Sequence, residues 1–283
     1  TASPALAGVI PELQPWYIAP MQPAIQVARA KGAVTASGLT PQAVRAAAPA
    51  SLELSAPTPV EEVEELQDAV IAQAEISEGG ASVSYKIGDG IDIPGDNSPR
   101  KTMIALFNLP PRFDYVTSPR LVSAAYRRVK AINESQYMLL PGQAQLFEGD
   151  DYIGKTRIER ITPGQEIELY FGVDDRIFIE RELVKRETDK KLLGDQRRIR
   201  FAYELKLENH TGESQSILVW DQIPVSRHES IKVKLESSEP KVNKQDDLNR
   251  LEWRLDLGAG AKQTIRYEFV VESPREMQII GLR

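Results

Sequence analysis

Apolar and polar side chains alternate with a period of two along most of the C-terminal half of this 283-residue chain. Strict alternation puts one set of side chains on each face of a β-strand and is typical of antiparallel sheets with one buried and one solvated face. The sequence therefore predicts an all-β fold, an antiparallel β-sandwich or two packed sandwiches. The predicted strands include residues 167–173, 199–207, 231–235, 251–257 and 265–271, separated by turn signals at 141–142, 163–164, 209–212 and 258–260.

Residues 1–57 are rich in Ala and Pro and poor in charge. Each Pro removes a backbone donor and disfavours helix in the residue before it, so we expect a linker or an extended arm. Trp16 and Tyr17 are the only aromatic residues of this segment. They leave a second interpretation open, in which both side chains anchor the arm on the folded part of the chain or on a partner.

Residues 58–78 have the pattern of a short acidic amphipathic helix. Thr58 can cap it, Pro59 suits the first helical position, and Glu61 completes a capping box. Apolar residues then recur at helical spacing. The apolar stripe of residues 59–76 suits a coiled-coil remnant, through which the chain could dimerise, and it also suits a helix docked on the β domain.

The strand-forming region divides into two parts, residues 81–184 and residues 197–275, the second of which could be an Ig-like sandwich. Between them, residues 185–196 are charged, contain Gly194 and interrupt the alternation. This stretch fits a boundary between two β subdomains. It fits equally well a long hairpin loop between two strands of one sheet.

The net charge is concentrated near the N-terminus. The chain has 35 Lys and Arg against 41 Asp and Glu, and residues 1–80 hold 3 and 9 of them, so residues 81–283 are electrically neutral. A neutral folded part argues against nucleic acid as a partner, because phosphate binding needs a basic surface. No apolar run reaches the roughly 18–20 residues of a transmembrane helix, so no transmembrane segment is expected.

The absence of Cys and the presence of only two His exclude thiolate chemistry and His-rich metal cages, and they argue against a Ser-His-Asp triad. We therefore predict no catalytic residue, no cofactor and no metal site. Asp174-Asp175 is expected to form a turn at a strand end. The acidic loop residues Asp89, Asp92, Asp96 and Asn97 match no calcium-loop spacing.

Residues 149–156, with the sequence GDDYIGKT, match the phosphate-loop pattern G-x-x-x-x-G-K-[ST]. A phosphate loop needs a helix that begins at its Lys, because the helix N-terminus binds the phosphates. Only five residues separate Thr156 from Thr162, and Pro163-Gly164 follows, which leaves no room for that helix. We predict a β-hairpin that turns at Gly149-Asp150, so the match is a false positive.

The best candidates for an interaction surface lie between residues 217 and 228. Leu218 and Trp220 share the strand face opposite Ile217 and Val219. Apolar residues on both faces imply that the strand is covered on both sides or that one face binds a partner. The candidate residues are Trp220, Asp221, Pro224, Ser226 and His228.

His210 and His228 are both expected at the surface, in a hairpin turn and in a polar loop. Two Asn residues, Asn133 and Asn209, begin N-x-[ST] triplets and match glycosylation sequons by pattern only. Neither feature identifies an active site.

Residues 81–275 contain a series of short motifs in a fixed order, at 91–94, 118–121, 140–142, 147–150, 153–154, 163–166, 169–174 and 221–226. This order resembles the C-terminal β-rich domain of the mucoidy inhibitor A (MuiA-like) family of bacterial proteins. The resemblance implies a domain of unknown function, with no established catalytic residues. Members of that family carry a small β domain and a coiled coil before this domain.

Together these features favour a non-enzymatic β-sandwich scaffold or protein-interaction module. The resemblance implies a bacterial protein associated with the cell envelope that affects exopolysaccharide production, with a protein partner. An extracytoplasmic or envelope location is expected, and the residues themselves also allow a cytoplasmic one. The alternative is a carbohydrate-binding module or a glycan-active enzyme that uses Trp220 or exposed acidic residues.

Overall fold

The computed structural model describes residues 11–21, 75–79, 82–86, 102–188 and 195–282, and it divides the chain into two compact units. Unit 1 comprises Thr1–Gln22 and Phe107–Arg283, and unit 2 comprises Pro23–Leu106. All regular elements of the described residues are strands, which confirms the all-β prediction. In the same residues, no helix is long and apolar enough to cross a membrane.

In unit 2, β2 (Glu75–Gly79) pairs antiparallel with β3 (Ser82–Lys86). The helix predicted over residues 58–78 is therefore wrong for residues 75–78, because their backbone is extended and pairs with β3. Residues 58–74 of that prediction lie outside the described residues, as do Asp89, Asp92, Asp96 and Asn97.

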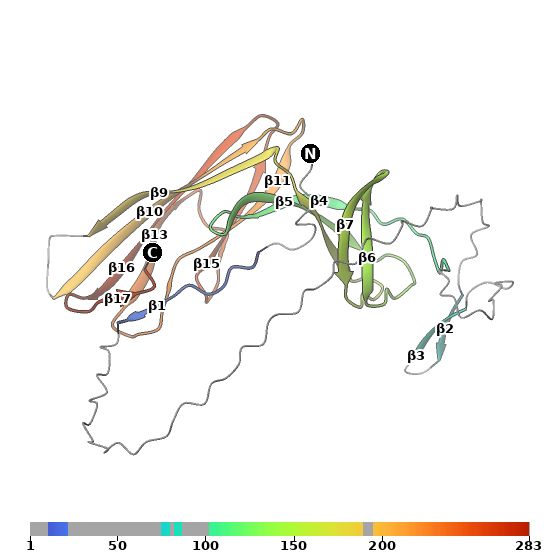
Figure 1. Ribbon diagram of the computed structural model, residues 1–283, viewed down its shortest axis with the longest axis horizontal. Coiled ribbons are helices and arrows are strands. Elements are labelled where there is room, and N and C mark those ends of the chain that lie inside the picture. The colour runs from blue at the N-terminus through green and yellow to red at the C-terminus, as the bar shows by residue number, and fades with distance from the viewer. Residues whose placement is uncertain (1–10, 22–74, 80–81, 87–101, 189–194, 283) are drawn as a thin grey trace, which may run out of the picture. The chain divides into compact units, whose positions relative to one another are not determined.

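Unit 1 contains two large sheets (Figure 1). The six-stranded sheet has the order β14-β15-β11-β4-β5-β8, and the four-stranded sheet has the order β13-β16-β10-β9. The first is built from β4 (Arg112–Ser118), β5 (Val122–Ile132), β8 (Glu166–Val173), β11 (Gln215–Gln222), β14 (Lys244–Gln245) and β15 (Arg250–Leu257). The second is built from β9 (Ile177–Thr188), β10 (Gln196–Asn209), β13 (Lys232–Glu239) and β16 (Lys262–Pro274).

Two smaller sheets complete unit 1. In one, β1 (Tyr17–Pro20) lies between β12 (Val225–Ser226) and β17 (Ile279–Ile280). In the other, β6 (Gly142–Glu148) pairs with β7 (Asp151–Ile158). The five predicted strands fall on β8, β10, β13, β15 and β16, because a two-residue period can be read locally from the chain.

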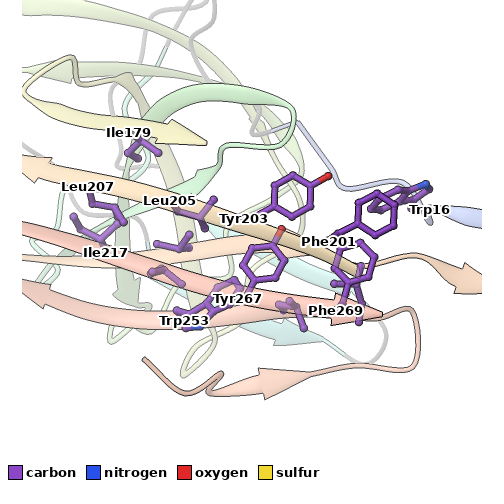
Figure 2. Close-up of a cluster of buried hydrophobic side chains, with 14 of the residues drawn as sticks. Trp16, Ile179, Phe201, Tyr203, Leu205, Leu207, Ile217, Trp253, Tyr267 and Phe269 are labelled. Carbon is purple, nitrogen blue, oxygen red and sulfur yellow. The ribbon is translucent and has the colours of Figure 1, made fainter. Parts of the chain in front are cut away.

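The two large sheets share one apolar core, so they form a single sandwich. Aromatic rings of adjacent strands stack at its centre: Phe201 and Phe269 have centroids 5.0 Å apart, and Tyr203 and Tyr267 have centroids 5.4 Å apart. Figure 2 shows these rings between the strands. The six-stranded sheet contributes Tyr115, Ala125, Ile217, Val219, Leu251 and Trp253 to the same core.

The polar side chains that alternate with the apolar ones along β10 and β16 lie on the outer face of the four-stranded sheet. Its side chains form cross-strand ion pairs, such as Arg200 with Glu268 at 2.7 Å and Arg266 with Glu204 at 2.9 Å. Opposite charges on neighbouring strands stabilise a solvated sheet face by modest amounts. This face is therefore the wet face that the alternation predicts.

The sandwich differs from the predicted division into residues 81–184 and 197–275. β9 and β10 pair antiparallel from Ile199 opposite Thr188 to Asn209 opposite Ile177. Residues 185–188 of the charged stretch form the end of β9 and Gln196 begins β10, so the stretch belongs to one pair of neighbouring strands. Both large sheets combine strands from before and after it, so it is not a boundary between two subdomains.

The sheets are also not purely antiparallel. β11 pairs parallel with β4, with Val219 opposite Thr117, and β1 pairs parallel with β12. Parallel pairing needs a long connection, which the chain between Ser118 and Gln215 provides. β11 is also the strand that the sequence predicts to be apolar on both faces, as parallel strands commonly are.

Candidate functional site

Asp221 lies in the core, which contradicts its prediction as a surface interaction residue. Side chains alternate along a strand, so Asp221 shares the core face of β11 with Ile217 and Val219, and it has no exposed surface. Its Oδ2 accepts hydrogen bonds from Arg181 Nε at 2.8 Å and from the Tyr267 hydroxyl at 2.7 Å. A buried carboxylate requires such partners, so Asp221 has a structural role.

Arg181, Asp221 and Tyr267 form a buried clamp between the two large sheets. Arg181 also donates to the Tyr267 hydroxyl at 3.0 Å, and its guanidinium lies 3.8 Å from the centre of the Tyr203 ring. Burial and then Asp221 raise the pKa of Tyr267 well above its ordinary value. Burial opposes the charge of Arg181, but Asp221 outweighs it, and the pKa of Arg181 is raised. The guanidinium of Arg181 therefore stays charged at neutral pH.

The backbone after Asp221 is covered by the N-terminal strand. Pro224 is buried and Ser226 is partly buried. The N–H of Val225 donates to the C=O of Trp16 at 2.7 Å, as β1 pairs with β12. The predicted contact surface around Pro224 is thus occupied by a segment of the same chain.

Trp16 anchors this segment on unit 1. Its indole N–H donates to the C=O of Gly281 at 2.6 Å, and its ring meets that of Phe269 edge-on, with centroids 6.1 Å apart. The Trp16 side chain is 8% exposed, and Ile18 is 1% exposed. Figure 2 shows Trp16 at the end of the aromatic row. Trp16 and Ile18 therefore belong to the core, so the second interpretation holds for Trp16, whereas the side chain of Tyr17 is exposed.

His228 is exposed, as predicted. The hydroxyl of Ser226 donates to the C=O of His228 at 2.7 Å, and His228 Nδ1 accepts the N–H of Ser230 at 3.1 Å. These bonds order the loop after β12. The structure does not bring the five predicted interaction residues together, because Asp221 and Pro224 are buried while Trp220 lies on the other face of β11.

Trp220 belongs to a second, smaller apolar cluster. Leu218 and Val116 are buried on the face of the six-stranded sheet opposite the core, together with Tyr126, and Trp220 packs partly buried against them. β11 is thus apolar on both faces because its second face is also covered at Leu218, by Val116 and Tyr126. Trp220 itself remains partly exposed at the rim of this cluster.

A cavity of about 300 Å³ lies beside Trp220. Its walls include Glu12 and Leu13 from the segment before β1, Lys244 from β14 and Glu252 from β15. The indole N–H of Trp220 lies 3.4 Å from Glu252 Oε2. The cavity therefore combines an indole ring and leucine side chains with charged groups that can donate and accept hydrogen bonds.

Sequence reasoning missed the residues that share this cavity with Trp220. Trp220 lies directly opposite Glu252 on β15, and Glu252 lies directly opposite Lys244 on β14. Residues that face each other across strands share one face of a sheet. This row depends on strand pairing between distant segments, so the alternation within each strand gives no signal for it.

The phosphate-loop match is a hairpin, as predicted. β6 and β7 pair from Gly142 opposite Ile158 to Glu148 opposite Asp151, and Gly149 in the turn has a φ of +59°. Lys155 and Thr156 lie within β7, where a phosphate loop would start a helix. Phe147 and Tyr152 face each other near the turn, and their ring centroids are 5.4 Å apart.

The two sequons are buried turns. Asn133 and Asn209 have no exposed surface. The Asn209 amide donates to the C=O groups of Glu213 and Leu257, both at 2.8 Å, and its Oδ1 accepts the Thr211 hydroxyl at 2.6 Å. Asn133 accepts the Ser135 hydroxyl in the same way. These Asn residues use their side chains as turn-forming groups and are not accessible for glycosylation.

Asp174 forms the turn predicted at the end of β8. Its carboxylate binds Arg176 Nη2 at 2.7 Å and accepts the Tyr115 hydroxyl at 2.7 Å. The hydrogen bond from Arg176 is the main cause that lowers the pKa of Asp174 from 3.8 to about 2, against the effect of burial. Burial and then Asp174 raise the pKa of Tyr115 to about 12.

This lowered pKa predicts an acid-dependent loss of stability. A carboxyl with a lowered folded-state pKa stabilises the fold above its ordinary pKa, and this contribution is lost as pH falls from about 4 to about 2. The stability difference between the natural chain and Asp174→Asn, measured by urea unfolding, should therefore shrink over this range. Asp175→Asn, which removes the adjacent exposed carboxylate, is the control. An Asp174→Asn difference that does not vary with pH would contradict the prediction.

Other side chains also have pKa values that are shifted away from neutrality. Burial and then Glu168 raise the pKa of Tyr170 to about 12, and hydrogen bonds to Arg250 outweigh burial and lower the pKa of Asp246. Among the described residues with a shifted pKa, only that of Arg120 moves toward neutrality, because it is buried. The part of the chain that the structure describes also contains no cluster of three or more His, Asp or Glu side chains suited to a metal.

A family model described as "Domain of unknown function (DUF4139)" matches residues 1–275. The chain is also similar to Protein F37C4.5 of Caenorhabditis elegans, with 25% identity over 223 residues. This match covers 74% of the chain, and the chain spans only 40% of the length of that relative. The family match begins at residue 1, in keeping with the packing of residues 11–21 into unit 1.

Proposed function

We propose that this chain, which belongs to the DUF4139 family, a domain of unknown function, is a non-enzymatic β-sandwich scaffold and protein-interaction module. The exposed aromatic pair on the β6–β7 hairpin, Phe147 and Tyr152, carries the proposal. The hairpin belongs to the same compact unit as the sandwich. Residues near a turn that a rigid scaffold positions are commonly used to bind partners.

The state of the titratable groups supports a non-enzymatic function. A general acid or base works best with a pKa near the operating pH. Asp174, Tyr115 and Tyr170 are shifted to about 2, 12 and 12, away from neutrality. Their charges and hydrogen bonds are used to hold strands and turns together.

The resemblance to the MuiA-like family supports the finer part of the proposal, an envelope-associated bacterial protein that affects exopolysaccharide production. In this proposal, the chain acts outside the cytoplasm. The similarity to a protein of Caenorhabditis elegans concerns the domain alone, because the chain spans 40% of that relative.

The tip of the β6–β7 hairpin is the part of unit 1 best suited to contact a protein partner. Phe147 and Tyr152 are each 52% exposed although they are large and aromatic. Exposed aromatic side chains are enriched at protein interfaces. The outer face of the four-stranded sheet is less suitable, since its charges are already paired.

Site-specific photo-crosslinking tests this proposal in the full chain. A benzophenone amino acid at Tyr152 should capture a defined protein in an extract of the source cells, and Phe147→Ala should reduce the yield severalfold. The same probe at Lys206, which binds Glu182 at 3.1 Å on the ion-paired sheet face, should capture nothing specific. Recovery of no partner, together with turnover of a substrate by the chain, would overturn the proposal.

A further inference from the structure

We infer that the cavity beside Trp220 is a binding site for an uncharged, hydroxyl-rich saccharide. This inference goes beyond the proposed scaffold function, because the cavity lies on the six-stranded sheet and shares no residue with the aromatic pair of the β6–β7 hairpin. It rests on the architecture of the cavity wall, on the pairing of the charges and on the exposure of one tryptophan.

The wall is built from three neighbouring strands. Trp220 of β11, Glu252 of β15 and Lys244 of β14 lie in one cross-strand row on the face opposite the core. Their backbones are fixed by sheet hydrogen bonds, so the side chains are presented from a rigid base. Leu13, which is 9% exposed, adds an apolar contact from the segment before β1.

The charges of the cavity are largely neutralised within the protein. Arg250 Nε binds Asp246 Oδ2 at 2.5 Å, and Glu252 binds Arg254 at 2.9 Å. Lys244 and Glu12, one cation and one anion, have no ion-pair partner among the described residues. A ligand with a strong net charge would therefore meet no matching excess charge, whereas these groups still offer donors and acceptors to hydroxyls.

Trp220 differs from the other two tryptophans of the chain. Trp253 is fully buried, and its indole N–H bonds to the Ser238 hydroxyl at 3.1 Å. Trp16 is held by Gly281. Trp220 is only partly buried and lines the cavity, with its N–H directed to Glu252.

A sugar ring matches this combination of groups. One face of a pyranose is made of C–H groups, which pack on an indole ring, while its rim of hydroxyls bonds to carboxylate, ammonium and guanidinium groups. The volume of about 300 Å³ is at the low end for small-molecule pockets, so the cavity encloses only one or two rings of a saccharide, and the other rings of a longer one would extend along the surface.

The test is a titration of the full chain with four tetrasaccharides: cellotetraose, maltotetraose, chitotetraose and a galacturonic acid tetramer. Calorimetry and tryptophan fluorescence report binding, and the fluorescence change should come from Trp220, because the other two indoles are buried. At least one uncharged tetramer should bind with a Kd of about 0.1–1 mM. Titration with the parent polysaccharide of that tetramer distinguishes a polymer from a free oligosaccharide as the source.

Trp220→Ala should weaken binding at least tenfold. Since this change also removes part of an apolar cluster, Lys244→Gln is a second variant that leaves the cluster intact, and it should weaken binding about two- to fivefold. Tyr152→Ala, which removes an exposed aromatic ring from the hairpin, is the matched control and should bind normally. Binding by none of the uncharged tetramers, binding by the galacturonic acid tetramer alone, or equal loss in Tyr152→Ala and Trp220→Ala would overturn the inference.

Discussion

Replacing Asp221 by Asn should lower the free energy of unfolding by about 3–5 kcal/mol, because the change leaves the charge of Arg181 buried without its counter-ion. Asp221 has no exposed surface, and Arg181 has 15% of its side chain exposed. An Asn of the same shape can still accept the Tyr267 hydroxyl, so the cost comes mainly from the uncompensated guanidinium. Urea unfolding followed by circular dichroism measures this difference.

The matched control is Glu204→Gln on the outer face of the same sandwich. Glu204 binds Arg266 at a similar distance, 2.9 Å, but Arg266 is 69% exposed. Exposed pairs contribute about 1 kcal/mol or less. Adding Arg181→Met to Asp221→Asn should recover stability, since it removes the buried charge. A cost for Asp221→Asn as small as that of the control would mean that the two sheets do not enclose this pair.

The strands and hairpins of this fold could be predicted from the sequence because their signals are local. Alternation over residues 199–207 and 265–271 is sufficient to define β10 and β16, and Gly149-Asp150 is sufficient to define the turn between β6 and β7. The same local argument excluded a phosphate loop, since the chain after Thr156 is too short for the required helix.

The buried cluster of Arg181, Asp221 and Tyr267 could not be predicted from residue types. Charged side chains usually lie at the surface, whereas the alternation along β11 places Asp221 on the core face with Val219. Arg181 likewise continues the inward phase of Ile177 and Ile179. Two opposite charges that each occupy an inward position of a strand are a signal for a buried pair, but only their pairing across sheets identifies them as partners.

Composition was the misleading signal at the N-terminus. The Ala- and Pro-rich character of residues 1–57 indicates an extended chain, and β1 is indeed extended. An extended segment can still be part of a core when its partners lie far away in the chain, as β12 and β17 do. Pairing with such distant strands gives no local pattern in the sequence around Trp16. Only the two aromatic residues, Trp16 and Tyr17, indicated an anchor.

Replacing Trp16 by Ala should lower the free energy of unfolding by about 3–5 kcal/mol, the usual cost of removing a large buried aromatic side chain. The variant loses the edge-on contact with Phe269 and the hydrogen bond to Gly281. A larger residue at Gly281 cannot fill the space that the Trp16 side chain leaves, because a Cβ at Gly281 would lie 2.5 Å from the carbonyl oxygen of Tyr17. Urea unfolding of the variant measures the global effect.

Hydrogen exchange locates the effect and supplies the control. The N–H groups of Val225 and Arg227 donate to Trp16 and Ile18, so both should lose protection when β1 detaches. Tyr17→Ala removes a side chain that is 37% exposed and stacks on the guanidinium of Arg227 at 3.7 Å, so it should cost only about 1 kcal/mol. If Trp16→Ala leaves both amides protected, β1 is held by its backbone alone. If Tyr17→Ala costs as much as Trp16→Ala, the anchor of the N-terminal segment lies on its exposed face and not in the core.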